Sequence, residues 1–198
     1  MSQESTKRVV GLTGGIASGK SSALGYFQAL GWSVLSADTL AGQILASDQS
    51  VQDEIKQRWG NDLINSCGSV DKAAIAAVVF GKESERLWIG ELLHPIIRSK
   101  WISFVQSCPS PKCMIELPLL FENNLQNYFT CTISTFAPIP TMLKRLQSRG
   151  LSKDDSVLRI NSQLTNFQKI DLADYVLWGG GSKEFLNNQV REIHSILS

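Results

Sequence analysis

The sequence predicts an α/β protein with a three-layer α/β/α fold and a parallel central sheet, on three observations. Short runs of apolar and β-branched residues alternate along the chain with longer helical patterns. A glycine-rich segment follows the first of these runs and precedes the first helical pattern. The 198 residues, 43% of them apolar, suffice for one domain with a sizeable core. Strands that alternate with helices in this way form a parallel sheet covered on both faces.

The elements follow in order from these patterns. Strands are expected at residues 9–13, 32–35, 113–117, 130–134 and 175–177. Helices are expected at residues 20–30, 39–46, 51–59, 72–80, 83–105, 141–148, 152–166 and 183–197. Gly31 should stop the first helix, Pro95 should interrupt helix 83–105, and Asp38 is placed to cap helix 39–46. The helical stretch between the second and third strands is too long for a simple crossover, so we expect a substrate-binding insert there.

The glycine-rich segment carries the most specific motif of the chain. It reads G-G-I-A-S-G-K-S and fits G-x-x-x-x-G-K-[ST] at every fixed position. Glycines let successive backbone N–H groups turn toward phosphate oxygens, and the next helix offers its positive N-terminus. A structural glycine-rich turn is the alternative, which the preceding strand and the following helix disfavour. The nucleotide-binding residues predicted here are Gly14, Gly15, Ile16, Ala17, Ser18, Gly19, Lys20, Ser21 and Ser22.

Within this loop, Lys20 is expected to reach the β- and γ-phosphates, and the Ser21 hydroxyl is expected to bind Mg²⁺. A guanine-reading N-K-x-D and a D-x-x-G switch are both absent from the sequence, which disfavours a GTPase. An ATP-driven machine usually needs a longer chain. A small-molecule kinase is therefore the favoured class of P-loop protein.

Carboxylates at strand ends are candidates for the chemistry, because the carboxyl ends of parallel strands line the ligand crevice. Asp38 follows the second strand and could orient or deprotonate an attacking hydroxyl, or could only cap the next helix. Glu116 ends the third strand and could hold Mg²⁺ through water, or could be an ordinary strand-end carboxylate. The spacing alone decides neither case.

Cationic residues are candidates for binding phosphate. Arg145 and Arg149 are four residues apart, so a helix would place them on one face, where they could neutralise the moving phosphoryl group. A solvated basic face is the alternative, and spacing alone favours it. Arg98 could bind an acidic substrate, whereas His94 beside Pro95 is more often a packed residue than a catalytic one.

Composition narrows the partners. Lys and Arg number 19 against 18 Asp and Glu, so the net charge of +1 leaves no general nucleic-acid footprint. The four cysteines contain no C-x-x-C pair, and with two histidines they predict reduced, mostly buried thiols rather than a zinc site. The longest apolar run, residues 73–80, is far too short to span a membrane. We therefore expect a cytoplasmic protein, monomeric or weakly homo-oligomeric, with a small-molecule substrate and no nucleic-acid or membrane partner.

The motifs, in their order along the chain, resemble those of the dephospho-coenzyme A kinases. The matching segments cover nearly the whole chain and are G-L-T-G-G-I-A-S-G-K-S from Gly11, Ala37-Asp38, L-H-P-I from Leu93, P-L-L-F-E from Pro118, L-K-R from Leu143 with Arg149, Gln163, and Ala173-Asp174. The resemblance implies ATP-dependent phosphorylation of the ribose 3′-hydroxyl of dephospho-coenzyme A, the last step of coenzyme A synthesis. A kinase with another nucleoside or nucleotide acceptor, and a non-catalytic nucleotide-binding module, are the alternatives.

The resemblance also implies an architecture and a set of roles. A P-loop core (about 8–38, 108–137 and 171–198) would carry a helical substrate-binding insert (about 39–107) and a lid (about 138–170). ATP and Mg²⁺ are the implied cofactors. The roles that follow are catalysis by Asp38, Lys20 and Arg145, nucleotide binding by Arg149, substrate binding by Asp38, His94, Arg98 and Leu119, and metal binding by Ser21 and Glu116.

Three segments depart from the family pattern. Ser36-Ala37-Asp38 replaces the common D-A-D, so one carboxylate is missing. Trp178-Gly179-Gly180-Gly181 lacks the usual Asn near the adenine, and Asn166-Phe167 replaces a usually charged pair. These departures put the metal environment and the adenine contacts in question.

Overall fold

The computed structural model describes residues 7–60, 63, 70 and 72–198. The chain divides into two compact units. One consists of the described residues up to Ser36 together with Val105–Ser198, and the other is built from Ala37–Phe104. Cys67, one of the cysteines expected to be a reduced thiol, lies outside the described residues.

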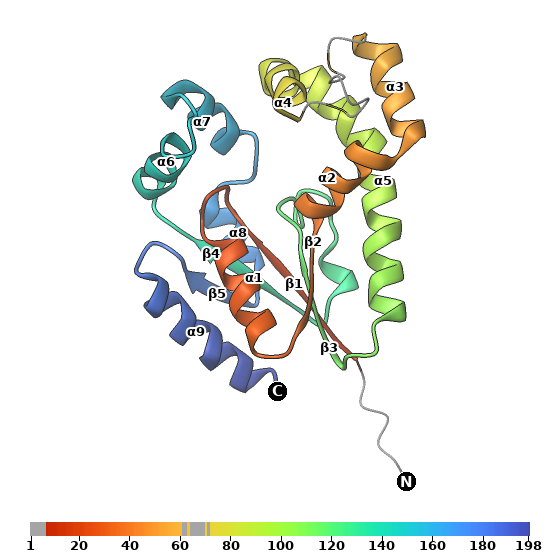
Figure 1. The fold of residues 1–198 in the computed structure, drawn as a ribbon. Coiled ribbons are helices and arrows are strands. Elements are labelled where there is room, and N and C mark those ends of the chain that lie inside the picture. The colour runs from red at the N-terminus through yellow and green to blue at the C-terminus, as the bar shows by residue number, and fades with distance from the viewer. Residues whose placement is uncertain (1–6, 61–62, 64–69, 71) are drawn as a thin grey trace. The chain divides into compact units, whose positions relative to one another are not determined.

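The first unit is built around a five-stranded sheet (Figure 1). Its strands are β1 (Arg8–Gly14), β2 (Ser33–Ser36), β3 (Lys112–Glu116), β4 (Cys131–Phe136) and β5 (Tyr175–Trp178). They lie in the order β2-β3-β1-β4-β5, and every neighbouring pair is parallel. All five strands fall within two residues of the predicted positions, so the predicted parallel sheet is confirmed.

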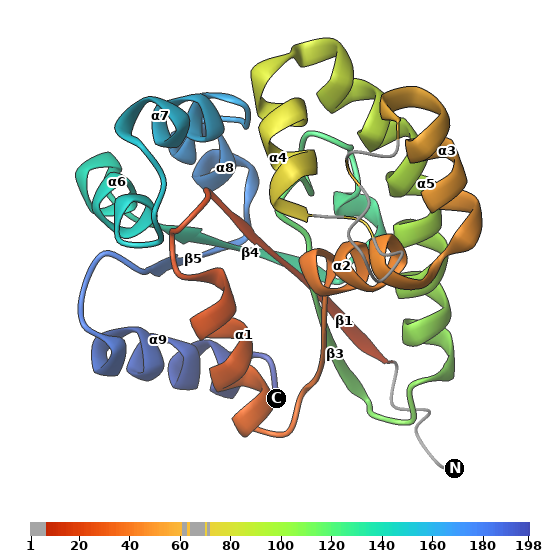
Figure 2. The same ribbon diagram turned by 45° about the horizontal axis from the view of Figure 1, so that its top comes forward.

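Helices α1 (Lys20–Ala29) and α9 (Lys183–Ile196) lie side by side over one face of this sheet (Figures 1 and 2). The core there is a cluster of buried side chains from the strands and the two helices, which includes Val10, Leu12, Phe27, Met114, Ile133, Leu177 and Val190. Alternate residues of β1 therefore point at these helices, as the two-residue period of a strand requires.

The intervening positions of β1 point to the other face. A methyl carbon built on Gly11 would lie 2.6 Å from a side-chain carbon of Leu120 and 2.9 Å from the ring of Phe129. This face also carries α8 (Asn166–Leu172), which packs on β1 and β4. Both faces of the sheet are thus covered, and the three-layer fold is confirmed. The remaining elements of this unit are η2 (Gln126–Tyr128), α6 (Ile139–Gln147) and α7 (Lys153–Asn161).

The second unit is helical. Its helices are α2 (Ala37–Ser47), α3 (Gln49–Trp59), α4 (Lys72–Gly81) and most of α5 (Glu83–Ser107). They enclose a core of their own, with Ile44, Val51, Ile55, Ile75, Ile89 and Leu93 among its buried side chains. The Asp48 carboxylate caps α3 by accepting the backbone N–H of Val51 at 3.3 Å. In the described part of the chain, no helix is long and apolar enough to cross a membrane.

Three local predictions were wrong. Helix α5 continues through Pro95 instead of stopping there, because burial of Leu93 and Trp101 on either side offsets the one helical hydrogen bond that proline cannot donate. Helix α2 begins at Ala37, so Asp38 lies inside its first turn and is not its cap. The helix expected at 152–166 ends at Asn161, and α8, which was not predicted, begins at Asn166.

The break between α7 and α8 has a local cause. The Thr165 side chain caps α8 in a reciprocal pair with Gln168, which starts a new helix at this point. The backbone N–H of Leu164 donates to the Glu122 carboxylate at 2.9 Å instead of continuing the helical ladder. The connection between the two helices is therefore held by specific hydrogen bonds.

Candidate active site

The glycine-rich loop runs from the end of β1 to the start of α1. Two of its glycines have strongly positive φ angles, +137° at Gly14 and +113° at Gly19, which other residues rarely adopt. A methyl carbon on Gly14 would also collide with the backbone carbonyl of Thr135 on β4. Gly14 is therefore required both by the turn and by the close approach of the neighbouring strand.

Lys20 opens α1 and lies back against the loop that precedes it. Its Nζ donates to the carbonyls of Gly14 at 3.0 Å and of Gly15 at 2.9 Å, and the residue is only 7% exposed. Ser21 and Ser22 follow in the first turn and are exposed. The loop thus brings a cation, two hydroxyl groups and a helix N-terminus together, which is the donor set that a polyphosphate requires.

A second glycine-rich loop, Gly179–Gly181, closes on the first. The Gly179 N–H donates to the Phe136 carbonyl at 2.7 Å. A methyl carbon on Gly179 would lie 1.9 Å from the carbonyl oxygen of Ser18, so only glycine fits there. This contact was not predicted from the sequence. The signal for it was present, because Ser182 follows the three glycines and caps α9, repeating the strand, glycine loop and helix order of the first motif.

Arg145 of α6 joins the two loops. Its Nη1 donates to the Ala17 carbonyl at 2.9 Å and its Nη2 to the Gly179 carbonyl at 2.7 Å. Arg149 lies just beyond the end of α6. The two arginines share a hollow of about 150 Å³, whose other lining residues are Ala17, Gly19, Ser22, Gly179, Gly181, Ser182, Lys183 and Leu186. Three cations, Arg145, Arg149 and Lys183, therefore line one small site beside the phosphate loop.

A buried acidic residue, Glu116, ends β3, the strand that pairs with β1 and so lies next to the strand that leads into the phosphate loop. Glu116 is 2% exposed and lies in register with Leu12 of β1 on one side and Ser36 of β2 on the other. The described residues contain no group of three or more acidic, histidine or cysteine side chains that could form a metal cage. Mg²⁺ does not need one, since it keeps several waters and takes one or two protein ligands together with phosphate oxygens.

The predicted substrate residues Asp38, His94 and Arg98 belong to the helical unit. Asp38 is exposed in the first turn of α2. Burial and the neighbouring Arg98 guanidinium lower the pKa of His94, whose ring lies against Gly90 one turn earlier. The Nε of Arg98 is buried and has no hydrogen-bond partner among the described residues. Leu119, the fourth predicted substrate residue, is half-buried in the sheet unit.

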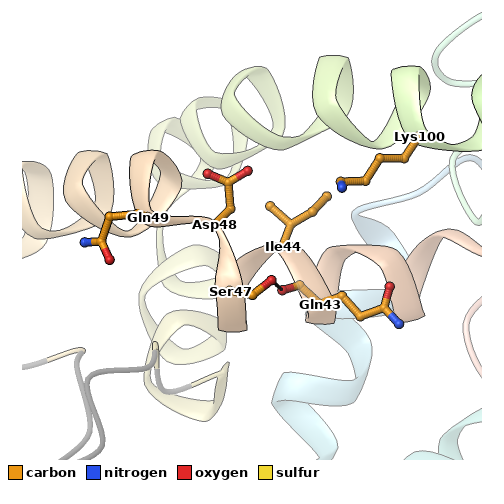
Figure 3. Close-up of a pocket in the computed structure, with 6 residues that line it drawn as sticks. All are labelled: Gln43, Ile44, Ser47, Asp48, Gln49 and Lys100. Carbon is orange, nitrogen blue, oxygen red and sulfur yellow. Dashed lines mark hydrogen bonds between the residues drawn. The ribbon is translucent and has the colours of Figure 1, made fainter.

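An open hollow of about 540 Å³ lies within the helical unit (Figure 3). It is lined by Gln43, Ile44, Ser47, Asp48, Gln49 and Lys100. The Ser47 hydroxyl donates to the Gln43 carbonyl at 2.8 Å, so this hydroxyl is already engaged. None of the predicted substrate residues lines this hollow.

Comparison with known proteins identifies the family. A model of the dephospho-CoA kinase family matches residues 8–184. A dephospho-CoA kinase of Legionella pneumophila (strain Paris) is 33% identical over 186 residues, which are 93% of this chain and 92% of that protein. The chain belongs to the dephospho-CoA kinase family.

Solved structures agree on the fold. A crystal structure from Thermus thermophilus is 26% identical, with a TM-score of 0.79 over 96% of this chain and 98% of its own. The dephospho-CoA kinase from Campylobacter jejuni is 23% identical, with a TM-score of 0.65 over 98% of each chain. These structures share the P-loop kinase fold, and membership of the dephospho-CoA kinase family makes the protein an ATP-dependent kinase.

Two segments that depart from the dephospho-CoA kinase pattern meet in space. The ring centroid of Phe136 lies 5.6 Å from that of Phe167 and 5.1 Å from that of Trp178. Asn166 donates to the Ala137 carbonyl at 2.9 Å. Phe167 thus has an aromatic partner in this chain. The two departures from the family pattern, at residues 166–167 and 178–181, both pack against Phe136.

Proposed function

We propose that this protein transfers the γ-phosphoryl group of ATP to the ribose 3′-hydroxyl of dephospho-coenzyme A, giving coenzyme A and ADP. This is the activity of the family to which the chain belongs. The observation that supports it most directly is the phosphate loop, in which Lys20 lies on the loop carbonyls while Gly179 and Arg145 close over the loop backbone.

The proposed roles follow from charge and position. Phosphoryl transfer needs little covalent help, so the enzyme acts mainly by placing groups and stabilising charge. Lys20 contacts the β- and γ-phosphates, and Arg145 with Arg149 neutralises negative charge on the polyphosphate. Both arginines line the hollow beside the loop, which supports this assignment.

The acceptor side is assigned to the helical unit. Asp38 orients or deprotonates the 3′-hydroxyl, and its exposed position in the first turn of α2 leaves the carboxylate accessible. Arg98 is the candidate partner for a substrate phosphate because its Nε lacks an acceptor among the described residues. His94 is a further proposed substrate contact in this unit, and Leu119 is one in the sheet unit. In this scheme residues 39–107 form the substrate-binding insert and residues 138–170 the lid, whose closure excludes water.

Mg²⁺ is proposed as the metal cofactor, and the residues present fit it. The exposed Ser21 hydroxyl stands at the start of α1, and Glu116 supplies one buried carboxylate at the end of β3. One hydroxyl and one water-bridged carboxylate are the few protein ligands that this ion prefers beside phosphates. When bound, the ion neutralises charge on the β- and γ-phosphate oxygens. A cytoplasmic location and a monomeric or weakly associating state belong to the same proposal.

The test is an ADP-release assay with ATP, Mg²⁺ and dephospho-coenzyme A, with the product identified by mass spectrometry. We expect the acceptor to gain one phosphoryl group, and fragmentation should place it on the ribose 3′-oxygen. Lys20→Ala should lose this activity, whereas Lys153→Ala, which changes an exposed lysine at the start of α7, should keep it. ATP binding without phosphoryl gain by dephospho-coenzyme A would refute the proposal, and transfer to another nucleoside would replace it.

A further inference from the structure

Gln163 lies on the connection between α7 and α8, and its side chain reaches the phosphate loop. Its Oε1 accepts the backbone N–H of Ile16 at 3.2 Å. A side-chain amide accepts at its oxygen and donates from its nitrogen, so this bond determines which end faces the loop. The Nε2 group then carries two N–H donors with no acceptor among the described residues.

The connection that carries Gln163 is anchored by a buried ion pair. Glu122 Oε1 accepts the Leu164 N–H at 2.9 Å and the Lys169 Nζ at 2.8 Å. Lys169 is fully buried, and its Nζ also donates to the Pro118 carbonyl at 2.6 Å. Burial lowers the pKa of Lys169, and the Glu122 carboxylate opposes that shift. A buried charge is costly unless it is paired, so this pair holds the connection in one place.

Further contacts hold the chain just after Gln163. Thr165 caps α8, and the Asn166 amide donates to the Ala137 carbonyl at 2.9 Å. A methyl carbon built on Gly15 would collide with Asn166 Oδ1, which shows how closely α8 approaches the loop. The chain that follows Gln163 is therefore fixed at Leu164 by Glu122 and at Asn166 by the Ala137 carbonyl.

The contact between Gln163 and Ile16 lies next to the part of the loop that Lys20 binds. Lys20 Nζ is bound to the carbonyls of Gly14 and Gly15, the two residues directly before Ile16. The lysine of this motif reaches the β- and γ-phosphates. The Nε2 donors of Gln163 are thus placed beside the loop residues that Lys20 binds, and Lys20 is the residue expected to contact the terminal phosphate.

We propose that Gln163 donates from Nε2 to the terminal phosphate of a bound nucleoside triphosphate, and that Glu122 and Lys169 are positioning residues for it. The inference rests on the proposed function only in taking a nucleoside triphosphate as the ligand. It predicts that Gln163 distinguishes ATP from ADP, which lacks the terminal phosphate.

The test compares the affinities for ADP and for the imido analogue of ATP, each with Mg²⁺, by calorimetry on the full chain. Gln163→Leu should weaken the analogue by about tenfold or more, the range of a hydrogen bond to a charged group, and should change ADP less than about twofold. Gln163→Glu keeps an acceptor for Ile16 but loses the donor, so it should weaken the analogue at least as much. Gln126→Leu, at an exposed position of η2 outside residues 138–170, is the matched control and should change neither.

Variants at Glu122 test the positioning. Glu122→Gln keeps an oxygen for Leu164 and should retain the preference for the analogue. Glu122→Leu combined with Lys169→Met removes both buried charges, so no unpaired lysine is left. The double variant leaves the Leu164 N–H without its acceptor and should therefore lose the preference for the analogue over ADP. Thermal unfolding of each variant reports whether it folds.

The outcomes separate cleanly. Equal weakening of ADP and the analogue in Gln163→Leu, or no change in either, would overturn the proposal. A preference that survives in the folded Glu122 and Lys169 double variant would remove the positioning role. Because the readout is nucleotide binding, it stands even if the wild-type protein fails to phosphorylate dephospho-coenzyme A, which would refute the proposed function alone.

Discussion

Gly179→Ala is the substitution whose effect the structure defines most sharply. The new methyl carbon would lie 1.9 Å from the Ser18 carbonyl oxygen, so the two loops must separate by about 1.5 Å or more to reach ordinary contact. That movement breaks the Gly179 N–H bond to Phe136, now 2.7 Å, and the Arg145 bond to the Gly179 carbonyl, also 2.7 Å. One neutral and one charged hydrogen bond together contribute about 3 kcal/mol.

The expected result is a fall in Tm of about 6–12 °C for a chain of this size, measured by calorimetry. The kcat/KM for ATP should fall more than that for the acceptor, because the changed contacts lie on the nucleotide loop. Gly25→Ala is the control, since a methyl carbon there meets nothing within 4 Å in the middle of α1 and should stabilise the helix by up to about 1 kcal/mol. A Gly179→Ala enzyme with wild-type Tm and wild-type kcat/KM for ATP would show that this contact has been misjudged.

Three further predictions concern other parts of the chain. Asp38→Asn should lower kcat by at least about a hundredfold in steady-state assays while ADP affinity stays within about threefold, and near-normal turnover would remove Asp38 from the chemistry. Burial lowers the pKa of His94 below its ordinary 6.5, so near that pH the unfolded chain binds more protons than the folded one, and stability should rise with pH up to about 6.5. In His94→Gln, the urea midpoint should depend less on pH between about pH 5.5 and 7.5, and an unchanged pH dependence would contradict this. Burial raises the pKa of Cys113 to about 11, whereas a hydrogen bond from Ser33 lowers the pKa of Cys108. Iodoacetamide at pH 8 followed by peptide mapping should therefore find Cys108 modified before Cys113, and the reverse order would count against the assignment.

Periodicity predicted the elements because each signal is local. Residues 9–13 are apolar and β-branched, and the strand extends only one residue further at each end. Gly31 follows the first helix with a φ of +87°, as its predicted stop requires. Pro95 misled because proline removes one hydrogen bond but does not forbid a helix whose two halves are both buried. The phosphate loop was predictable for the same local reason, since its motif is continuous in sequence.

The rest of the candidate site depends on contacts between distant segments. Arg145 was given its role by the family resemblance, because its spacing from Arg149 alone favoured a solvated basic face. Its bonds to Ala17 and Gly179 join residues 128 and 34 positions away. Gln163 was noticed as a motif residue, yet its contact with Ile16 required a helix break that the pattern of residues 152–166 did not reveal. Helical periodicity cannot report such a break, because the interruption is stabilised by Glu122 from another segment.

The replacement of the family's usual carboxylate by Ser36 has a physical rationale in the sheet register. Ser36 lies directly beside Glu116 on the adjacent parallel strand, and Glu116 is 2% exposed. Two carboxylates in these positions would repel, and burial would strengthen the repulsion unless a cation lay between them. A serine at 36 removes that repulsion and keeps a hydroxyl that can donate to Glu116 or to a water. The acidic character of this strand end then rests on Glu116, which is the one carboxylate of the pair left for the proposed Mg²⁺ site.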